Sequence, residues 1–405
     1  MMDFSTLKAR YRDRRFFYLL NHHVKRYVQV LRYYQEDLRW RVRSKRNTRG
    51  SGENIGEARR SRYAEVGRRT AGDLHILHVG YGDRSGGEEG GGGVVDRYAS
   101  VNILPALKHF GQVREFTVEY PRHGFPGFAR AERQKANGEL LRIVEQANSR
   151  PDVVIGQMSG WMIDPGTLAA IRAQGIPVIN YCWDDTADFY GRKLGGIWTG
   201  PAALAAVVDL NLTSSRRSCL KYQAEGGLAV FWPEGANPEV HRPYDVPFEY
   251  DVSFVGGRYG YRPLLIEFLR ERGVHVSAFG PGWEKGLLSP EEMIKLYSRS
   301  RINLGFGEIG HMRSVKCLKG RDFEVPMSGG LYLTSRNSEL HECYEVGREI
   351  VCYNDGRDCL AKIRYLLSHP DEAEAIRKAG RQRALRDHAW SKRLEQVFRI
   401  IGHLE

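Results

Sequence analysis

Apolar residues recur along the first half of the chain in short runs. The runs LHILHVG, PDVVIG and PVINYCW begin at Leu74, Pro151 and Pro177, and stretches of helical character separate them. Short apolar runs that alternate with helices are typical of parallel strands joined by crossover helices. The pattern predicts a parallel α/β domain that continues through a further strand at Asp209 to Ser215.

The second half of the chain repeats this pattern after a proline-rich interval. Four prolines fall within the fifteen residues from Pro233 to Pro247, which predicts an extended connection between two domains. Strands are then predicted at VSFVGG, VHVSAFG, INLGFG, LYLT and REIVCYN, with helices from Asp371 onward. The chain therefore predicts a second α/β domain with its own parallel sheet.

A different pattern precedes both domains, because apolar residues between Phe16 and Trp40 recur every three or four positions, as one face of a helix requires. The positions of this stripe are Phe16, Leu20, Val24, Tyr27, Leu31, Tyr34 and Leu38. Lys and Arg fill much of the remainder, so the helix could lie on an anionic membrane surface. A helix that packs on its own domain explains the same periodicity, and the sequence leaves both interpretations open.

The charge of the chain is unevenly distributed. The net charge is +12, and residues 1–72 hold 19 Lys and Arg against 7 Asp and Glu, whereas the remainder holds 42 of each sign. A balanced body argues against a catalytic domain that binds nucleic acid, which needs clustered cations. A polyanionic partner, such as a membrane surface, is expected to meet residues 1–46, and residues 43–72, poor in large aliphatics, are expected to be a linker.

The cysteines and the N-terminus bear on the compartment. The six cysteines form no C-x-x-C pair and no zinc-type spacing, so we expect reduced thiols and no metal. The start MMDFSTLKARYRDRR lacks an apolar signal core, and no apolar run approaches the ~18 residues of a membrane span. These features predict a cytoplasmic protein, with peripheral attachment to the inner face of the membrane if the arm binds lipid.

The segment LKGRDFEVPMSGGLYLT, residues 318–334, combines charge, helix, turn and strand. Arg321 and Glu324 are three apart and share one helix face, while Gly329 and Gly330 mark the helix end before an apolar strand. Guanidinium groups bind phosphate and carboxylates accept from diols. The segment therefore suits a ligand with phosphate at one end and ribose hydroxyls at the other.

This segment resembles the signature of glycosyltransferase group 1 type domains, and especially the branch that includes the spore maturation protein CgeB. The residues that carry the resemblance are Lys319, Arg321, Phe323, Glu324, Gly329 and Gly330. The stretches PEGANPEVHRP and DVSFVGGRYGYRPLLIEFL resemble the interdomain segment and the opening of the second domain of such enzymes, and the likeness covers roughly residues 74–400.

Membership of this family implies the GT-B architecture, in which two Rossmann-like domains face a cleft and the C-terminal one holds a nucleotide diphosphosugar. The corresponding division is a basic arm and linker at 1–72, an acceptor domain at 73–243, a nucleotide-sugar domain at 244–390 and a final helix at 391–405. Many relatives carry a glutamate eight residues before the position of Glu324. Lys316 stands there in this chain, which predicts a contact to diphosphate and leaves the stereochemical course open.

Several residues are candidates for donor binding. A diphosphate that departs without a metal must be neutralised by cations and backbone N–H groups. Arg258 follows Gly257 directly after a predicted strand, and Lys316, Lys319 and Arg321 precede the face of Glu324. His311, after GFGEIG, is a candidate contact to the donor sugar. Each of these could instead be an ordinary solvated or structural side chain, and Glu324 could merely cap its helix.

Candidates for a general base follow a strand of the first domain. Asp184 and Asp185 come directly after PVINYCW, and the carboxyl ends of parallel strands face the ligand crevice. We expect one of the two to serve an inverting reaction and the other to cap a helix, although both could be structural. The glycine-rich stretch from Tyr81 to Gly93 lacks the third glycine of a dinucleotide fingerprint. We interpret it as a loop on the acceptor side, although an ordinary flexible surface loop explains the same stretch.

The leading hypothesis is a metal-independent glycosyltransferase that moves a sugar to a hydroxyl acceptor in cell-surface or envelope glycan synthesis. Glycan, glycolipid and protein acceptors all stay open. One rival is a nucleotide-sugar epimerase, which needs no acceptor. A second rival is a non-enzymatic protein that binds a nucleotide sugar and uses its arm on membrane or nucleic acid.

Overall fold

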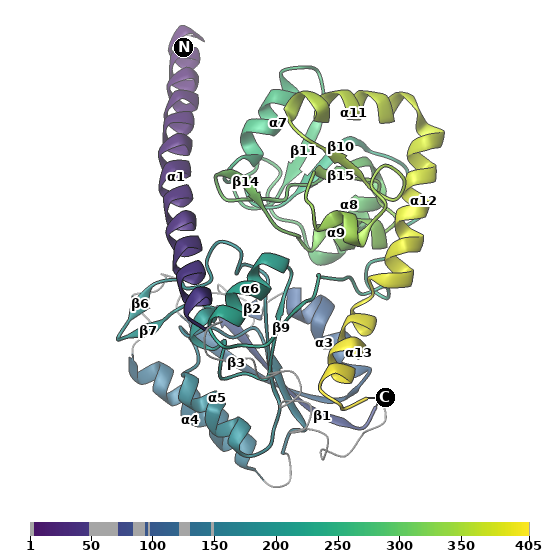
Figure 1. The fold of residues 1–405 in the computed structure, drawn as a ribbon. Coiled ribbons are helices and arrows are strands. Elements are labelled where there is room, and N and C mark those ends of the chain that lie inside the picture. Colours follow the sequence, from purple (N-terminus) through teal and green to yellow (C-terminus); the bar gives the residue numbers. More distant parts are fainter. Residues whose placement is uncertain are drawn as a thin grey trace. The chain divides into compact units, whose positions relative to one another are not determined.

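The computed structural model describes residues 4–47, 72–83, 94–95, 98–120, 130–146 and 150–404. The chain forms two compact units (Figure 1). Unit 1 comprises residues 1–38, 243–317 and 329–380, and unit 2 comprises residues 39–242, 318–328 and 381–405. The division between the central segments falls between Arg242 and Pro243, inside the proline-rich interval.

Unit 1 is built on a five-stranded parallel sheet with the order β11-β10-β12-β15-β16. Its helices bury apolar faces on this sheet, with Leu265, Ile266 and Ile363 among the core residues. The strands are β10 (Tyr250–Val255), β11 (Val276–Phe279), β12 (Ser300–Leu304), β15 (Tyr332–Ser335) and β16 (Val351–Tyr353), with the antiparallel hairpin β13 (Glu308–Ile309) and β14 (Met312–Lys316). The helices are α7 (Arg262–Arg270), α8 (Pro290–Arg299), α10 (Leu340–Cys343), α11 (Gly356–Ser368) and α12 (Pro370–Asp387), the last of which continues into unit 2.

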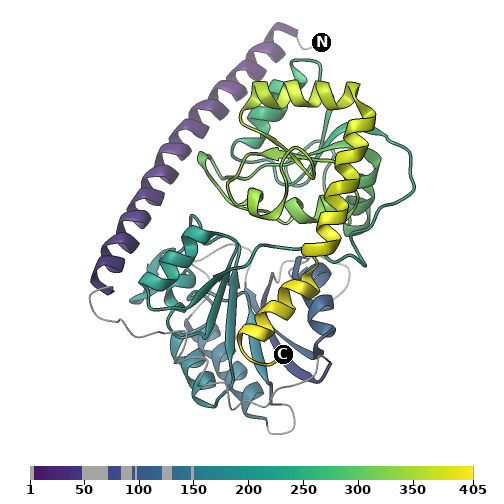
Figure 2. The same cartoon turned by 45° about the vertical axis from the view of Figure 1, so that its right-hand side comes forward.

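Unit 2 contains a seven-stranded sheet in which β3 joins the path β2-β1-β4-β5-β8-β9, and all pairings except that of β2 are parallel. Figure 2 shows α13 beside the sheet, where Trp390, Leu394 and Phe398 enter the core. The strands are β1 (Leu74–Asp83), β2 (Val94–Val95), β3 (Gly111–Tyr120), β4 (Val153–Gly156), β5 (Val178–Cys182), β8 (Leu210–Thr213) and β9 (Ala229–Phe231), with the hairpin β6 (Lys193–Leu194) and β7 (Ile197–Trp198). The helices are η1 (Ala99–Ile103), α3 (Leu104–Lys108), α4 (Arg130–Glu145), α5 (Pro165–Ala173), η3 (Pro201–Ala203), α6 (Arg216–Ala224), α9 (Arg321–Met327) and α13 (Trp390–Ile400).

Every strand that the apolar runs predicted is present, and the predicted α/β class with parallel sheets is confirmed. Strand β3 was not predicted, because Arg114, Glu115 and other polar residues interrupt its apolar positions. Of the glycine-rich stretch, residues 81–83 form the end of β1, while residues 84–93 lie outside the described residues.

The predicted N-terminal helix is confirmed and is longer than expected, because α1 spans Phe4–Asn47. Residues 43–47, which were expected to belong to the linker, continue this helix; residues 48–71 lie outside the described residues. All six cysteines are thiols, four of them buried. In the part of the chain that the structure describes, no helix is long and apolar enough to cross a membrane.

Candidate active site

The order of the unit 1 sheet reverses at β10, because β11 lies on one side of it and β12 on the other. Ligands of open parallel sheets bind beyond the carboxyl ends of the strands at such a reversal. Two glycine-containing loops follow the strands here, namely Gly256 to Arg258 after β10 and Gly305 to Glu308 after β12. The fold thus brings the predicted residues Gly257 and Arg258 to the edge where a ligand is expected.

The loop after β10 leads into the N-terminus of α7, where backbone N–H groups favour an anion. Gly256 has a φ of 149°, a conformation that favours glycine, and the carbonyl of Gly257 accepts a hydrogen bond from Arg262 Nη1 at 3.0 Å. Arg258 Nη2 lies 3.1 Å from Glu267 Oε1 and its guanidinium stacks on the Trp283 ring at 5.5 Å. The Arg258 charge is therefore present at the edge but is already engaged with neighbours.

Lys316 lies at the same edge of unit 1. Its Nζ donates to the carbonyl of Arg336 at 2.8 Å and is 3.6 Å from Glu308 Oε1. Glu308 is buried, and its other carboxylate oxygen accepts from Ser335 Oγ at 3.1 Å. The predicted cation is thus fixed beside a buried carboxylate that sequence reasoning missed, since only the hairpin register brings positions 308 and 316 together.

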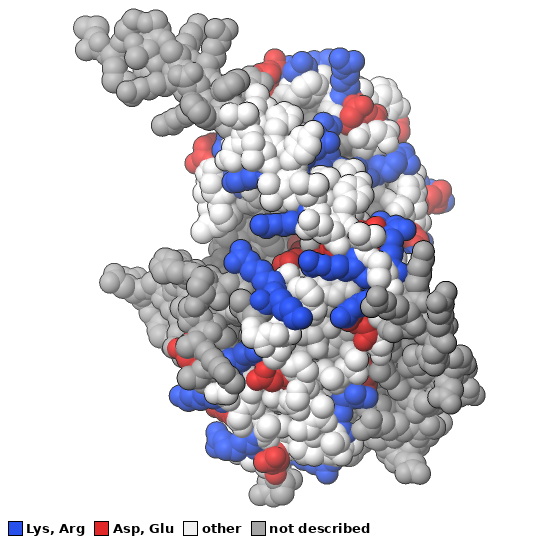
Figure 3. All heavy atoms as spheres, turned by 60° about the vertical axis from the view of Figure 1, so that its left-hand side comes forward, with Lys and Arg blue, Asp and Glu red and all other residues white. Residues whose placement is uncertain are grey.

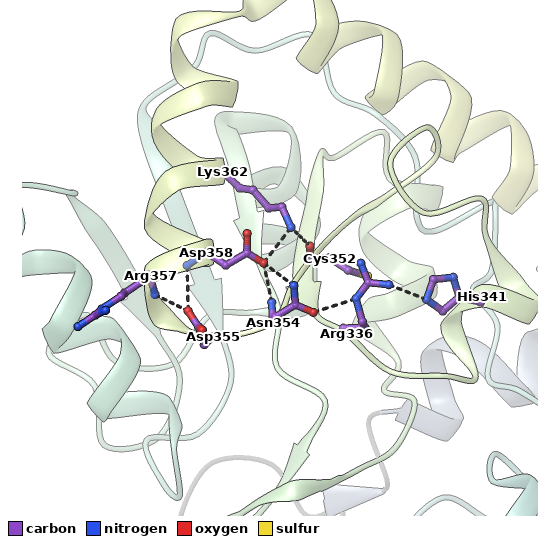
Figure 4. Close-up of polar contacts among 8 residues, drawn as sticks. All are labelled: Arg336, His341, Cys352, Asn354, Asp355, Arg357, Asp358 and Lys362. Atoms are coloured by element: carbon purple, nitrogen blue, oxygen red, sulfur yellow. Dashed lines mark hydrogen bonds and ion pairs between the residues drawn. The ribbon is translucent and has the colours of Figure 1, made fainter.

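Polar side chains also follow β15 and β16, where they contact one another (Figure 4). Arg336 Nε donates to Asn354 Oδ1 at 2.9 Å, and Asn354 donates through its backbone N to Asp358 Oδ2 at 2.8 Å. Lys362 Nζ donates to the same carboxylate oxygen at 2.9 Å and to the Cys352 carbonyl at 2.6 Å. This network fixes the two strand ends, and we assign it a structural role.

His311, the candidate sugar contact, lies in the turn between β13 and β14. Its Nδ1 is 2.7 Å from Nδ1 of His22 on α1, and its backbone N donates to Gln29 Oε1 at 2.8 Å. Burial lowers the pKa of both imidazoles, that of His22 to about 4. Two neutral rings can share one proton as donor and acceptor, whereas two charged rings would repel. In the structure, the ring and the backbone N–H of His311 therefore both contact the N-terminal helix.

The signature helix α9 begins at Arg321 and ends before Gly329, whose φ of 72° confirms the predicted turn into β15, with Gly330 next in the chain. Arg321 is partly buried in the first turn of this helix. Lys319, just before the helix, donates its backbone N–H to Asp322 Oδ2 at 2.8 Å.

Glu324 is buried in a polar cluster of unit 2. Its Oε1 accepts from Asn102 Nδ2 at 3.1 Å and lies 3.7 Å from Nε2 of the buried His241. Burial lowers the pKa of His241, although the Glu324 carboxylate opposes this shift. His241 Nδ1 lies 3.3 Å from the carbonyl of Asn237, which favours a proton on Nδ1. The segment around PEGANPEVHRP therefore packs against the signature helix.

Glu234 is a second buried carboxyl group in this cluster. Burial raises its pKa to about 8, while the Tyr98 hydroxyl and the Lys319 cation oppose the shift. The absence of a side chain at Gly320 lets this residue lie close to Tyr98 and Glu234, because an added Cβ would lie 2.8 Å from the Tyr98 ring and 3.1 Å from Glu234 Oε2. Sequence reasoning missed Glu234, His241 and Asn102, since none carries a local motif.

The adjacent aspartates after β5 have opposite environments. The Asp184 side chain is 80% exposed, and its Oδ1 lies 3.9 Å from Lys319 Nζ. Asp185 is fully buried and accepts hydrogen bonds from Thr213 Oγ1 at 3.0 Å and from Tyr222 OH at 3.1 Å. Burial raises the pKa of Asp185 to about 6. The enclosed carboxylate of Asp185 fits a structural role, and Asp184 is the member of the pair that a substrate can reach.

The described residues contain no group of three or more His, Cys, Asp or Glu side chains that could hold a metal ion. A cavity of about 200 Å³ opens at the amino-terminal ends of β1 and β3, beside His75 and Arg114. This cavity lies at the opposite edge of the unit 2 sheet from Asp184, and we do not assign it to the reaction.

Comparisons with known proteins support the class that this geometry indicates. The family model described as glycosyl transferase-like matches residues 262–399. No curated protein matches the sequence. Sucrose-phosphate synthase from Thermosynechococcus elongatus is similar in structure, with a TM-score of 0.55, 13% identity, and coverage of 80% of this chain and 98% of that one.

Two further solved structures are also similar to this chain in fold. HepE of Anabaena in complex with UDP and glucose has a TM-score of 0.54 at 10% identity, and the alignment covers 82% of this chain and 100% of that one. An alpha-glucosyltransferase in complex with UDP-glucose and abasic DNA has a TM-score of 0.53 at 11% identity, with coverage of 81% and 99%. The predicted GT-B fold is confirmed. The chain is an α/β protein of this fold with a glycosyl transferase-like region, in agreement with the predicted class of enzyme.

Proposed function

We propose that this protein transfers a sugar from a nucleotide diphosphosugar to a hydroxyl acceptor without a metal ion. The observation that carries the proposal is the reversal point of the unit 1 sheet, where two glycine loops, the N-terminus of α7 and the cation Lys316 lie at one edge. In the reaction, the bond from the anomeric carbon to the diphosphate oxygen breaks and a bond to the acceptor oxygen forms. Fixed cations and N–H groups would stabilise the diphosphate that leaves.

The remaining predicted residues have separate roles in this proposal. Glu324 would accept hydrogen bonds from the ribose hydroxyls, with Asn102 orienting its carboxylate. Lys319 and Arg321 would bind phosphate. Asp184 would take the proton of the acceptor if the reaction inverts the anomeric centre. The motif residues further support placement in the CgeB-like branch, and the names of the similar structures make UDP the first nucleotide to test.

The test is calorimetric titration of the full-length protein with UDP, then with TDP, GDP and ADP. Glu324→Ala is expected to weaken binding of the preferred nucleotide about tenfold, because a hydrogen bond to a charged group contributes roughly 1.5–3 kcal/mol. Glu374→Ala, which removes a carboxylate from α12, is the control and should leave binding unchanged. Equal affinities of wild type and Glu324→Ala would remove the assignment of this carboxylate to the ribose.

Product analysis separates the candidate activities. With donor alone, a transferase yields slow hydrolysis, whereas an epimerase yields an altered sugar. If nucleotide binds and neither hydrolysis nor transfer to any supplied glycan, glycolipid or protein acceptor occurs, the protein is a binding module. An envelope glycan acceptor is the expected outcome if the basic arm brings the enzyme to a membrane.

A further inference from the structure

The N-terminal helix α1 packs on unit 1 through one face only. Tyr18 OH donates to the carbonyl of Gly260 at 3.1 Å, and His22 and Gln29 contact His311. Tyr33, one turn further along the same face, is also buried. The contacts fix the rotation of the helix about its axis, so they also fix which side chains point away from the body.

The side chains that point away are those of the apolar stripe seen in the sequence. All six of its members with described side chains are between 50% and 73% exposed. They are Leu20, Val24, Tyr27, Leu31, Tyr34 and Leu38, and Val28 and Val42 extend the surface. The periodicity therefore does not come from packing on the body, as one interpretation of the sequence required. A continuous exposed apolar row of this length on a folded protein marks an interaction surface.

A row of cations borders this stripe along one edge. Lys25, Arg32 and Arg39 are exposed and seven residues apart, so they follow the helix in a line. Residues 4–47 hold 13 Lys and Arg against 3 Asp and Glu. Figure 3 looks onto the side of the molecule that carries α1 and shows Lys and Arg side chains among uncharged surface.

We propose that this stripe binds an anionic membrane surface, with its leucines and valines among the acyl chains and its tyrosines at the headgroups. Charge decides between this occupant and a second copy of the chain, since two copies would bring like charges together whereas anionic headgroups neutralise them. The helix would lie in the plane of the interface without crossing it. The other face would keep the enzyme attached through Tyr18, His22 and Gln29.

The experiment is sedimentation of the full-length protein with vesicles of phosphatidylcholine alone or with about one-third phosphatidylglycerol. We expect binding to the anionic vesicles only. The double variant Leu31→Asn, Leu38→Asn should lower the partition coefficient about tenfold for each leucine removed from the acyl region. The triple variant Lys25→Gln, Arg32→Gln, Arg39→Gln should lower it about fivefold for each cation.

Matched controls remove comparable groups elsewhere. Leu287 is 70% exposed and distant in sequence from α1, so the variant Leu287→Asn should bind vesicles like wild type. The double variant Arg348→Gln, Lys378→Gln removes two exposed cations outside α1 and should also bind like wild type. Circular dichroism of each variant shows whether α1 persists. The proposal fails if the wild-type protein does not bind vesicles, or if wild type and both α1 variants bind them equally. It also fails if analytical ultracentrifugation shows a wild-type dimer that the leucine double variant cannot form and that anionic vesicles do not disrupt.

Discussion

The parallel sheets of the two units share one architecture but differ in what their carboxyl-terminal edges contain. In unit 1 the strands β10 and β12 end in glycine loops beside Arg258 and Lys316. In unit 2 the strands β5 and β8 end in a closed hydrogen-bonded network around Asp185, Thr213 and Tyr222. Parallel strands can therefore end in glycine loops beside cations or in a closed hydrogen-bonded network. The difference depends on a few residues after each strand.

The largest expected effect comes from removing the fixed cation of the unit 1 edge. If Lys316 faces the departing diphosphate as proposed, Lys316→Met should lower kcat about a hundredfold to a thousandfold, because a preorganised cation is lost. Lys362→Met is a matched control, since Lys362 also donates to a carbonyl and pairs with a carboxylate. Steady-state transfer kinetics measure both variants. Equal losses in the two variants would mean that the effect is structural.

The next effect tests the closed edge of unit 2. Asp185→Ala should lower the free energy of unfolding by about 3 kcal/mol, because it leaves the buried Thr213 and Tyr222 hydroxyls without their acceptor. Asp184→Ala, one residue earlier and exposed, should change it by less than about 0.5 kcal/mol. Urea unfolding followed by circular dichroism compares the two. A similar stability for both variants would contradict the assignment of Asp185 to the fold.

A pH titration sharpens the contrast between the buried carboxyl groups. The pKa of Glu234 is raised from 4.5 to about 8, so its proton favours the folded state below pH 4.5, and this contribution is lost as the pH rises towards about 8. Glu234→Gln cannot ionise, and it should flatten the decline of unfolding free energy over this window by on the order of 2 kcal/mol. Parallel profiles for wild type and variant would show that Glu234 titrates normally.

The smallest effect concerns the helix that packs near the unit 1 edge. The pKa of His22 is lowered to about 4, so the neutral form stabilises the docked helix above pH 6.5 and this stabilisation is lost as the pH falls towards about 4. Limited proteolysis within α1 should accelerate across that range. His22→Gln should weaken this dependence, while His23→Gln, which alters the exposed neighbour, should preserve it. An unchanged profile in His22→Gln would exclude the pair with His311 as its cause.

Much of the fold could be predicted because buried parallel strands have a strong local signal. Runs such as LHILHVG and LYLT are mostly apolar, since the strands of such sheets are buried on both faces. The strand β3 was missed because Arg114 and Glu115 break its pattern. The turn at Gly329 was predictable for a local reason too, because a helix end in left-handed conformation favours glycine.

The candidate site was less accessible to sequence reasoning. The pattern indicated that only one of two adjacent aspartates would face the cleft, but which one depends on Thr213 and Tyr222, 28 and 37 residues downstream. Glu324 could be named from its motif, whereas its partner Asn102 is 222 positions away. Glu234 has no local signature, because its raised pKa follows from burial that only the assembled fold creates.

The close packing around Gly320 has a practical consequence. A methyl group there would lie 2.8 Å from the Tyr98 ring and 3.1 Å from Glu234, with no change in charge or hydrogen-bonding groups. Gly320→Ala is therefore expected to push the two polypeptide segments apart without removing any ionisable group. Turnover of this variant beside that of the parent enzyme would separate what proximity contributes to the rate from what the individual side chains contribute.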